Sequence, residues 1–122
     1  MYRLLLSFLC AVSSIPAIAQ IDSALGITAP KEVTRDHKQL TGSLCDGLVD
    51  ERDKANAIYN WITHNIKYDI KTFENGSFKS VKPDQVLKSR LAVCDGYAVL
   101  FTAMCREAGL KAVNVEGYAK DW

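Results

Sequence analysis

LAVCDGYAVLF, from Leu91 to Phe101, places a cysteine where an extended segment meets the first turn of a very apolar helix. The thiolate is the reactive form of cysteine, and the unpaired N–H groups and positive dipole end of a helix N-terminus favour negative charge. These residues make Cys94 a candidate nucleophile, although a lone cysteine beside a helix is more often a small buried core residue.

A base for this nucleophile is harder to identify. A cysteine of this kind needs a histidine to take its proton and a third group to orient that histidine. The only histidines, His37 and His64, both precede Cys94. His64 falls beside the apolar stripe of its expected helix, which is typical of a solvated histidine. We therefore expect this chain alone to be inactive.

The first 19 residues have the three parts of a secretory signal peptide. Arg3 precedes the apolar stretch 4–12, and Ala17-Ile18-Ala19 forms a small-x-small cleavage site before Gln20. The apolar stretch is too short to span a bilayer. The sequence predicts export to the periplasm or the extracellular space, with Gln20 as the first mature residue and no membrane anchor after cleavage.

The charge balance argues against two classes of partner. The chain has 15 Lys and Arg against 14 Asp and Glu, and removal of Arg3 with the signal peptide leaves the mature chain formally neutral. A neutral chain gives no electrostatic case for binding nucleic acid or an anionic membrane.

Three cysteines remain once Cys10 leaves with the signal peptide, so at least one thiol stays unpaired within the chain. Cys94 and Cys105 cannot pair if they share a helix, because eleven residues separate them by about 16 Å, beyond the Cα limit of about 7 Å. Cys45 could bridge to either, and a free thiol is equally compatible with its polar surroundings. No cysteine or histidine spacing is typical of zinc, so we expect no structural metal.

Residues 20–49 are expected to form a loosely ordered lead-in with one short helix over Val33 to Leu44. From Asp50 the helical pattern strengthens, and Asp50 with Asp53 resembles a capping arrangement. An apolar stripe at helical spacing predicts a helix to about Asn65; its members are Ala55, Ile58, Ile62 and Ile66, with Trp61 beside them. Trp61 and Tyr59 are expected to be core and surface anchors.

Shorter signals follow. Asn75-Gly76 predicts a tight turn between two phenylalanines. With Ser77 it also fits the N-glycosylation pattern, although a simple turn explains these residues equally well. Pro83-Asp84 suits the first turn of a helix, which we expect from Pro83 to Lys88.

The helix that begins at Cys94 is apolar on almost every side, since Thr102 is the only polar residue from Tyr97 to Cys105. Such a helix is central to its fold, and Cys105 is expected to lie in the core. Gly109 predicts a left-handed cap at its end. Residues 112–118 then alternate apolar and polar, which predicts a half-buried strand.

Several blocks in the same order resemble the transglutaminase-like superfamily, in particular its bacterial and kyphoscoliosis-peptidase-like branch. They are Lys54-Ala55, Ala57-Ile58-Tyr59, Trp61-Ile62, Asn65-Ile66, Tyr68-Asp69, Val93-Cys94-Asp95-Gly96-Tyr97-Ala98, Leu100-Phe101, Cys105-Arg106 and Gly117-Tyr118-Ala119-Lys120. The resemblance covers residues 50–122, which we expect to be the N-terminal portion of such a domain.

The resemblance implies an α+β, papain-like core in which the central helix, starting at the nucleophile, packs on an antiparallel sheet. It implies a Cys-His-Asp triad with Cys94 in the nucleophile's place. The His and Asp of the family lie on strands that follow the Gly117-Tyr118-Ala119-Lys120 block, so they match no residue here, and the domain is expected to be truncated after its first core strand.

The activity that the resemblance implies is acyl transfer through a Cys94 thioester, from a protein or peptide substrate and without a cofactor. In this mechanism the backbone N–H of Cys94 is the expected donor to the oxyanion. Transfer to an amine gives cross-linking, and transfer to water gives peptide or amide hydrolysis. Two alternatives remain open: a non-catalytic cell-surface or periplasmic interaction module on the same fold, and a small scaffold with a structural Cys45–Cys94 disulfide.

Two neighbours of Cys94 have more than one interpretation. Asp95 stabilises the first turn of a helix, but its charge opposes formation of a thiolate beside it. Gly96 indicates either a close approach between helices or the absence of a side chain next to the nucleophile.

Overall fold

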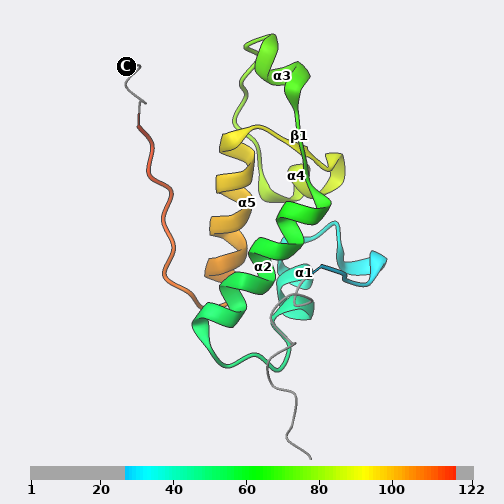
Figure 1. Ribbon diagram of the computed structural model, residues 1–122, viewed down its shortest axis with the longest axis vertical. Helices are drawn as coiled ribbons and strands as arrows, with labels where there is room; N and C mark the ends of the chain where they lie inside the picture. The colour runs from blue at the N-terminus through cyan, green and yellow to red at the C-terminus, as the bar shows by residue number, and fades with distance from the viewer. Residues whose placement is uncertain (1–26, 118–122) are drawn as a thin grey trace, which may run out of the picture.

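The computed structural model describes residues 27–117, which form five α-helices and one two-stranded sheet (Figure 1). The predicted signal peptide 1–19, the cleavage site before Gln20 and the last residue of the predicted strand, Tyr118, lie outside these residues. In chain order the elements are a 3₁₀ turn at Lys31–Val33, α1 at His37–Leu44, α2 at Glu51–Asn65, β1 at Lys67–Tyr68, α3 at Ile70–Glu74, α4 at Pro83–Ser89, β2 at Leu91–Ala92 and α5 at Cys94–Glu107. The mixed α+β class expected from the sequence is confirmed.

Aspartate side chains determine where three of the helices begin. Asp36, Asp50 and Asp69 each accept a hydrogen bond from a backbone N–H in the first turn of α1, α2 or α3. The predicted capping of α2 by Asp50 and its end at Asn65 are therefore confirmed. The expected lead-in helix is divided, because Asp36 starts α1 at His37 and leaves a separate 3₁₀ turn before it.

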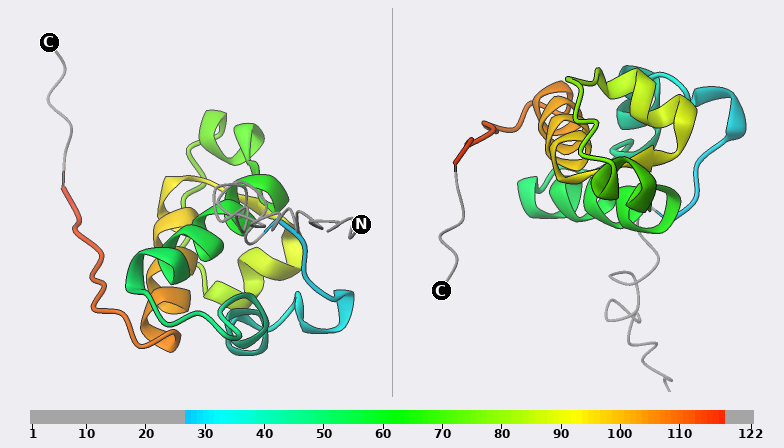
Figure 2. Two further views of the ribbon diagram at one scale, coloured as in Figure 1. Left: turned by 60° about the horizontal axis from the view of Figure 1, so that its bottom comes forward. Right: turned by 90° about the horizontal axis from the view of Figure 1, so that it is seen from above.

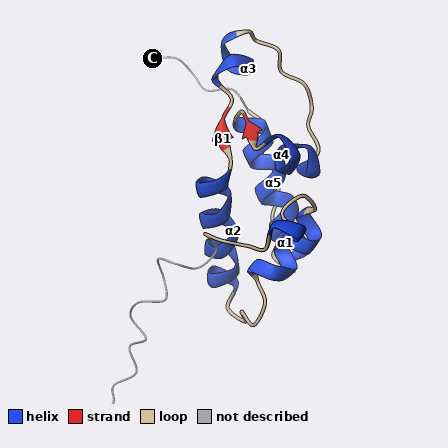
Figure 3. Cartoon of the chain, turned by 90° about the vertical axis from the view of Figure 1, so that its right-hand side faces the viewer, coloured by secondary structure: helices blue, strands red, loops and turns tan. Residues whose placement is uncertain are grey.

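The centre of the fold is α5, which packs against α1, α2, α4 and β2 (Figures 1 and 3). The largest fully buried apolar side chains come from four helices; they are Leu40, Ile58, Trp61, Val86, Leu87, Leu100 and Met104. Cys105 is 2% exposed, so its predicted place in the core is confirmed. Burial of these side chains is the main stabilising contribution to the bundle.

The end of α5 matches its sequence signal. Gly109 adopts φ +82°, and the N–H of Leu110 donates to the carbonyl of Cys105 at 2.9 Å. A second bond, from the Gly109 N–H to the Arg106 carbonyl at 3.0 Å, completes the left-handed helix ending that the sequence predicted.

The two strands that the structure describes are parallel. Lys67 pairs with Leu91 and Tyr68 with Ala92, so β1 and β2 lie side by side. The start of α5 follows β2 directly and packs against it. The antiparallel sheet implied by the family resemblance is not formed by residues 27–117 and stays an expectation.

The prediction of a strand over residues 112–118 is wrong for residues 112–117, the part that the structure describes. Residues 111–117 form neither helix nor strand, and the end of this segment points away from the bundle (Figure 2). A strand needs a neighbour for its backbone groups, and within residues 27–117 no chain segment pairs with this one. The apolar half of its pattern is accordingly unburied, with Val113 75% and Val115 90% exposed. Two side chains of α5 hold it: Arg106 Nε donates to the Ala112 carbonyl at 2.8 Å, and the Thr102 hydroxyl donates to Asn114.

The remaining local predictions need little correction. The turn predicted at Asn75-Gly76 is confirmed, with Gly76 at φ +62°, and it follows the short helix α3. The helix predicted from Pro83 is α4, which extends one residue further to Ser89. Within the described residues, no helix combines the length and apolar character needed to cross a bilayer.

Candidate functional site

Cys94 is the first residue of α5 and its side chain is exposed. The other two described cysteines differ, since Cys45 is partly buried and Cys105 is buried. Burial raises the pKa of both the Cys45 and Cys105 thiols, and the nearby Lys54 opposes this increase only at Cys45. Of the three described thiols, Cys94 is therefore the one that solvent and a substrate reach most easily.

The start of α5 lacks the side-chain cap that α1, α2 and α3 have. Its capping position is Val93, which carries no hydrogen-bond acceptor on its side chain. The first intrahelical bond runs from the Tyr97 N–H to the Val93 carbonyl at 3.2 Å, so the N–H groups of Cys94, Asp95 and Gly96 are not used by it. These donors remain available to an oxygen atom that carries negative charge.

The short parallel sheet places Cys94. The Asp69 N–H donates to the Ala92 carbonyl at 2.9 Å, and the Lys67 N–H donates to the Arg90 carbonyl at 2.9 Å. These bonds tie the chain that follows α2 to the residues immediately before Cys94. The start of α5 is consequently fixed by two segments that are distant in sequence.

Gly96 lets α5 approach β2 and α4 closely. A Cβ atom added at Gly96 would lie 2.9 Å from the Cβ of Ala92 and 3.4 Å from Cγ2 of Val86. Of the two interpretations of this glycine, the structure supports the close approach between elements.

A groove of about 430 Å³ opens beside the start of α5. Its lining includes Val93, which precedes Cys94, and Gly96, two residues after it, whereas Cys94 itself is not among the lining residues. The other lining residues are Asp69, Thr72, Ser77, Lys79, Ser80, Val81, Gln85, Val86, Ser89, Leu91 and Ala92. Apolar side chains and hydroxyl, amide and charged groups thus meet in one hollow, and its volume is within the usual range for ligand sites.

Asp69 brings a fixed negative charge to this groove. The backbone N–H of Thr72 donates to its Oδ1 at 3.1 Å, and the Thr72 hydroxyl donates to its Oδ2 at 2.7 Å. The backbone bond, followed by the hydroxyl bond, holds the pKa of the Asp69 carboxyl below its ordinary value. The carboxylate is therefore ionised at neutral pH.

A row of aromatic rings begins one helical turn after Cys94. Tyr97 stacks on Tyr68 at 6.5 Å between ring centroids, Tyr68 contacts Phe73 at 6.0 Å, and Phe73 contacts Phe78 at 6.3 Å. The Tyr97 hydroxyl donates to the Ile66 carbonyl at 2.8 Å, which fixes the partly buried end of the row. Tyr68, Phe73 and Phe78 are each about half exposed, so the row presents an apolar surface near the nucleophile position.

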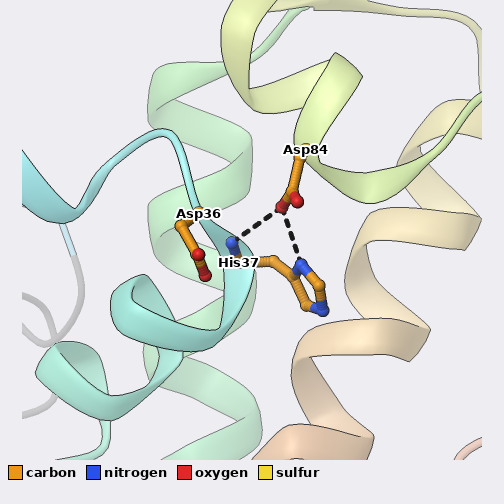
Figure 4. A group of neighbouring side chains, drawn as sticks. All are labelled: Asp36, His37 and Asp84. Carbon is orange, nitrogen blue, oxygen red and sulfur yellow. Dashed lines mark hydrogen bonds and ion pairs between the residues drawn. The ribbon is translucent and has the colours of Figure 1, made fainter.

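Within residues 27–117, neither histidine is hydrogen-bonded to Cys94. His64 is exposed on α2, where its Nδ1 lies 2.7 Å from the Asn60 carbonyl oxygen. His37 Nδ1 lies 2.7 Å from Oδ1 of Asp84, which projects from the first turn of α4 (Figure 4). The structure thus gives each histidine a partner other than the thiol.

Asp36, His37 and Asp84 are the one group in the described residues whose ligand atoms lie close enough to hold a metal ion, all within 4.8 Å (Figure 4). Hydrogen bonds account for all three positions: Asp36 caps α1, and His37 pairs with Asp84. Sequence reasoning missed this pair. The aspartate before the first helical residue was a local signal for α1, but no local signal indicated the contact across 47 residues.

Comparison with known proteins agrees with the residue blocks around Cys94. The profile of the transglutaminase-like superfamily matches residues 38–122. The kyphoscoliosis peptidases of Mus musculus and Homo sapiens are each 37% identical to the chain over 82 residues. These residues are 67% of this chain and only 12% of each relative, so the chain spans a small part of their length. No solved structure matches the chain. On this agreement between profile, relatives and the helix that begins at a cysteine, the chain belongs to the transglutaminase-like superfamily.

Proposed function

We propose that Cys94 is the nucleophile of an acyl-transfer reaction on a protein or peptide substrate. The observation that carries the proposal is the position of the thiol: it is exposed, at the uncapped start of α5, beside a groove. The exposed aromatic row offers a neighbouring apolar surface to a polypeptide. Membership of the superfamily supports the same chemistry.

The reaction begins when the Cys94 thiolate attacks the carbonyl carbon of a carboxamide or peptide bond. The carbonyl oxygen becomes an oxyanion, which the free N–H groups of the first turn of α5 can stabilise. Collapse of the intermediate breaks the C–N bond, and the departing amine takes a proton from water and leaves a thioester on Cys94. A second amine or water then attacks the thioester, which gives cross-linking or hydrolysis and restores the thiol.

The proposal assigns no catalytic part to His37 or His64, because each has its own partner in the structure. It includes export, for which the support is the sequence pattern of residues 1–19. Residues 20–122 alone are expected to show no turnover. Amine incorporation or cleavage by this chain, lost in Cys94→Ala, would show that one of the two histidines acts as a base.

Thiol labelling tests the position of Cys94 in the folded chain. We expect iodoacetamide to modify Cys94 faster than Cys105 by a factor on the order of ten or more, because Cys94 is exposed whereas Cys105 is buried and burial raises the pKa of its thiol. Peptide mapping at several times gives the rates. If Cys105 reacts first, the placement of the two thiols is wrong.

Activity is tested in the natural protein, with Cys94→Ala and with Cys45→Ser as the matched control. We expect Cys94→Ala to lower turnover of a glutamine- or amide-containing peptide by a factor of about 10³ or more, whereas Cys45→Ser retains activity. Equal activity in both variants would contradict the assignment of Cys94. A folded wild-type protein without any turnover would favour the non-catalytic interaction module.

A further inference from the structure

Cys45 and Cys105, both free thiols in the structure, lie toward the end of α5 opposite to Cys94. Cys45 caps the C-terminal end of α1, where its N–H donates to the Thr41 carbonyl at 2.9 Å. It packs, partly buried, against the same hydrophobic cluster that contains Cys105. The helices that carry the two residues, α1 and α5, pack directly on each other.

Lys54 gives further evidence of where the two thiols lie. Lys54 Nζ donates to the Ala108 carbonyl at 3.4 Å, one helical turn after Cys105. The charge of the same lysine opposes the increase that burial causes in the pKa of the Cys45 thiol. Burial, followed by the Cys45 thiol, raises the pKa of the Cys105 thiol. The end of α1, the first turns of α2 and the last turn of α5 therefore converge on one small region of the structure.

We propose that Cys45 and Cys105 form a disulfide that joins the end of α1 to α5 and leaves Cys94 as the free thiol. Cys94 and Cys105 are the first and twelfth residues of one continuous helix, which keeps them about 16 Å apart. Cys94 lies at the far end of α5 from the region where Cys45 packs. The fold thus favours one of the three possible pairings, and this pairing does not depend on the proposed catalytic function.

The oxidation needs a disulfide such as oxidised glutathione as its co-reactant. The thiolate of Cys45, the more exposed of the two, attacks one sulfur of oxidised glutathione and releases one glutathione thiolate. The thiolate of Cys105 then attacks the Cys45 sulfur of the mixed disulfide and releases the second. Two protein thiols lose two electrons and two protons, and one oxidised glutathione becomes two reduced molecules. An exported chain meets conditions of this kind.

The test compares the folded and the unfolded chain in the same glutathione buffer. Closing a short loop costs less conformational entropy than closing a long one. The unfolded chain should therefore form Cys94–Cys105, with a sequence separation of 11, more readily than Cys45–Cys105, with a separation of 60. The folded chain should reverse this order. We expect Cys45–Cys105 to exceed Cys94–Cys105 by a factor of about ten or more when folded, because helical geometry prevents the shorter link.

Peptide mapping by mass spectrometry without reductant measures each linked pair, after circular dichroism has confirmed the helical content. Cys94 should be recovered free or as a glutathione adduct. Cys45→Ser, which changes a partly exposed side chain, and Cys105→Ala, which keeps the core apolar, should each abolish the intramolecular link. The proposal is wrong if folded wild-type chain keeps Cys45 and Cys105 unlinked, if it forms Cys45–Cys94 instead, or if folding leaves the distribution of links unchanged.

Discussion

The Nδ1 atom of His37 lies 2.7 Å from Oδ1 of Asp84, and the backbone N–H of His37 donates to the same oxygen at 3.0 Å. The pair joins the first turn of α1 to the first turn of α4, so it fastens the lead-in segment to the body of the fold. The backbone bond, followed by the side-chain bond, holds the pKa of the Asp84 carboxyl below its ordinary value.

Because of this pair, the free energy of unfolding is expected to fall as the pH becomes acidic. A carboxyl whose folded pKa is depressed stabilises the fold above its unfolded pKa of about 3.9, and the contribution is lost as the pH falls through the lower folded value. Asp84→Asn should lower the free energy of unfolding by about 1 kcal/mol near pH 7, a value reduced by the partial exposure of the pair. Near pH 3 the difference should be much smaller, as measured by urea denaturation.

The control for Asp84 is Glu116→Gln, which removes a negative charge from an exposed side chain for which the described residues provide no hydrogen bond. It should change stability little at either pH. A loss for Asp84→Asn that is the same near pH 7 and near pH 3 would contradict the role of the carboxylate.

Two glycines allow a matched test of packing beside Cys94. Gly96→Ala would place a Cβ 2.9 Å from the Cβ of Ala92, and we expect it to lower the free energy of unfolding by about 1–3 kcal/mol. Gly42→Ala, within α1 and with no atom within 4 Å of the added Cβ, should raise it by up to about 1 kcal/mol through helix propensity. Urea denaturation measures both. Equal effects of the two substitutions would contradict the tight contact at Gly96.

Arg90 combines backbone strain with two stabilising contacts. It ends α4 in the left-handed region at φ +59°, while its guanidinium lies 4.8 Å from the Trp61 ring centre and donates to the Thr34 carbonyl at 3.3 Å. Arg90→Ala and Arg90→Gly both remove these contacts, but only glycine relieves the strain. The glycine variant should be more stable than the alanine variant by about 1 kcal/mol. Thermal melts of the two variants decide this, and an alanine variant of equal stability would show that the strain is negligible.

The proposed export predicts which residue is the first of the exported protein. If Ala17-Ile18-Ala19 is a signal-peptidase site, exported protein should begin at Gln20, with or without cyclisation to pyroglutamate. The intact mass of exported protein measures this directly. Ala19→Arg should block cleavage, whereas exported material that retains Met1 would contradict the predicted site.

The helices with strong local signals were the ones that sequence could predict. An aspartate cap and a regular apolar stripe determine α2, and a cysteine, an apolar run and a glycine cap determine α5. The short helix α3 was missed because its five residues, none of them buried, form no apolar stripe. Residues 112–118 had a strand pattern, but pattern alone cannot supply a hydrogen-bonding neighbour.

The same division applies to the site. The position of Cys94 at a helix start follows from adjacent residues, so sequence could predict it. The groove could not be predicted, because it is formed when the β1–β2 pairing brings Asp69 beside Ala92. The pairing of His37 with Asp84 likewise depends on how α1 and α4 pack, which no short window of sequence contains.

The connection between β1 and β2 has a consequence for how this fold can vary. Its exposed segment 77–80 contains no helix or strand, yet Ser77, Lys79 and Ser80 form part of the groove wall. Doubling the length of a flexible loop costs only about 0.6 kcal/mol in closure entropy. Insertions there would reshape the wall while the backbone bonds from Lys67 and Asp69 still hold the residues before Cys94. The chain can therefore change what it admits to the groove without refolding the helix that carries the thiol.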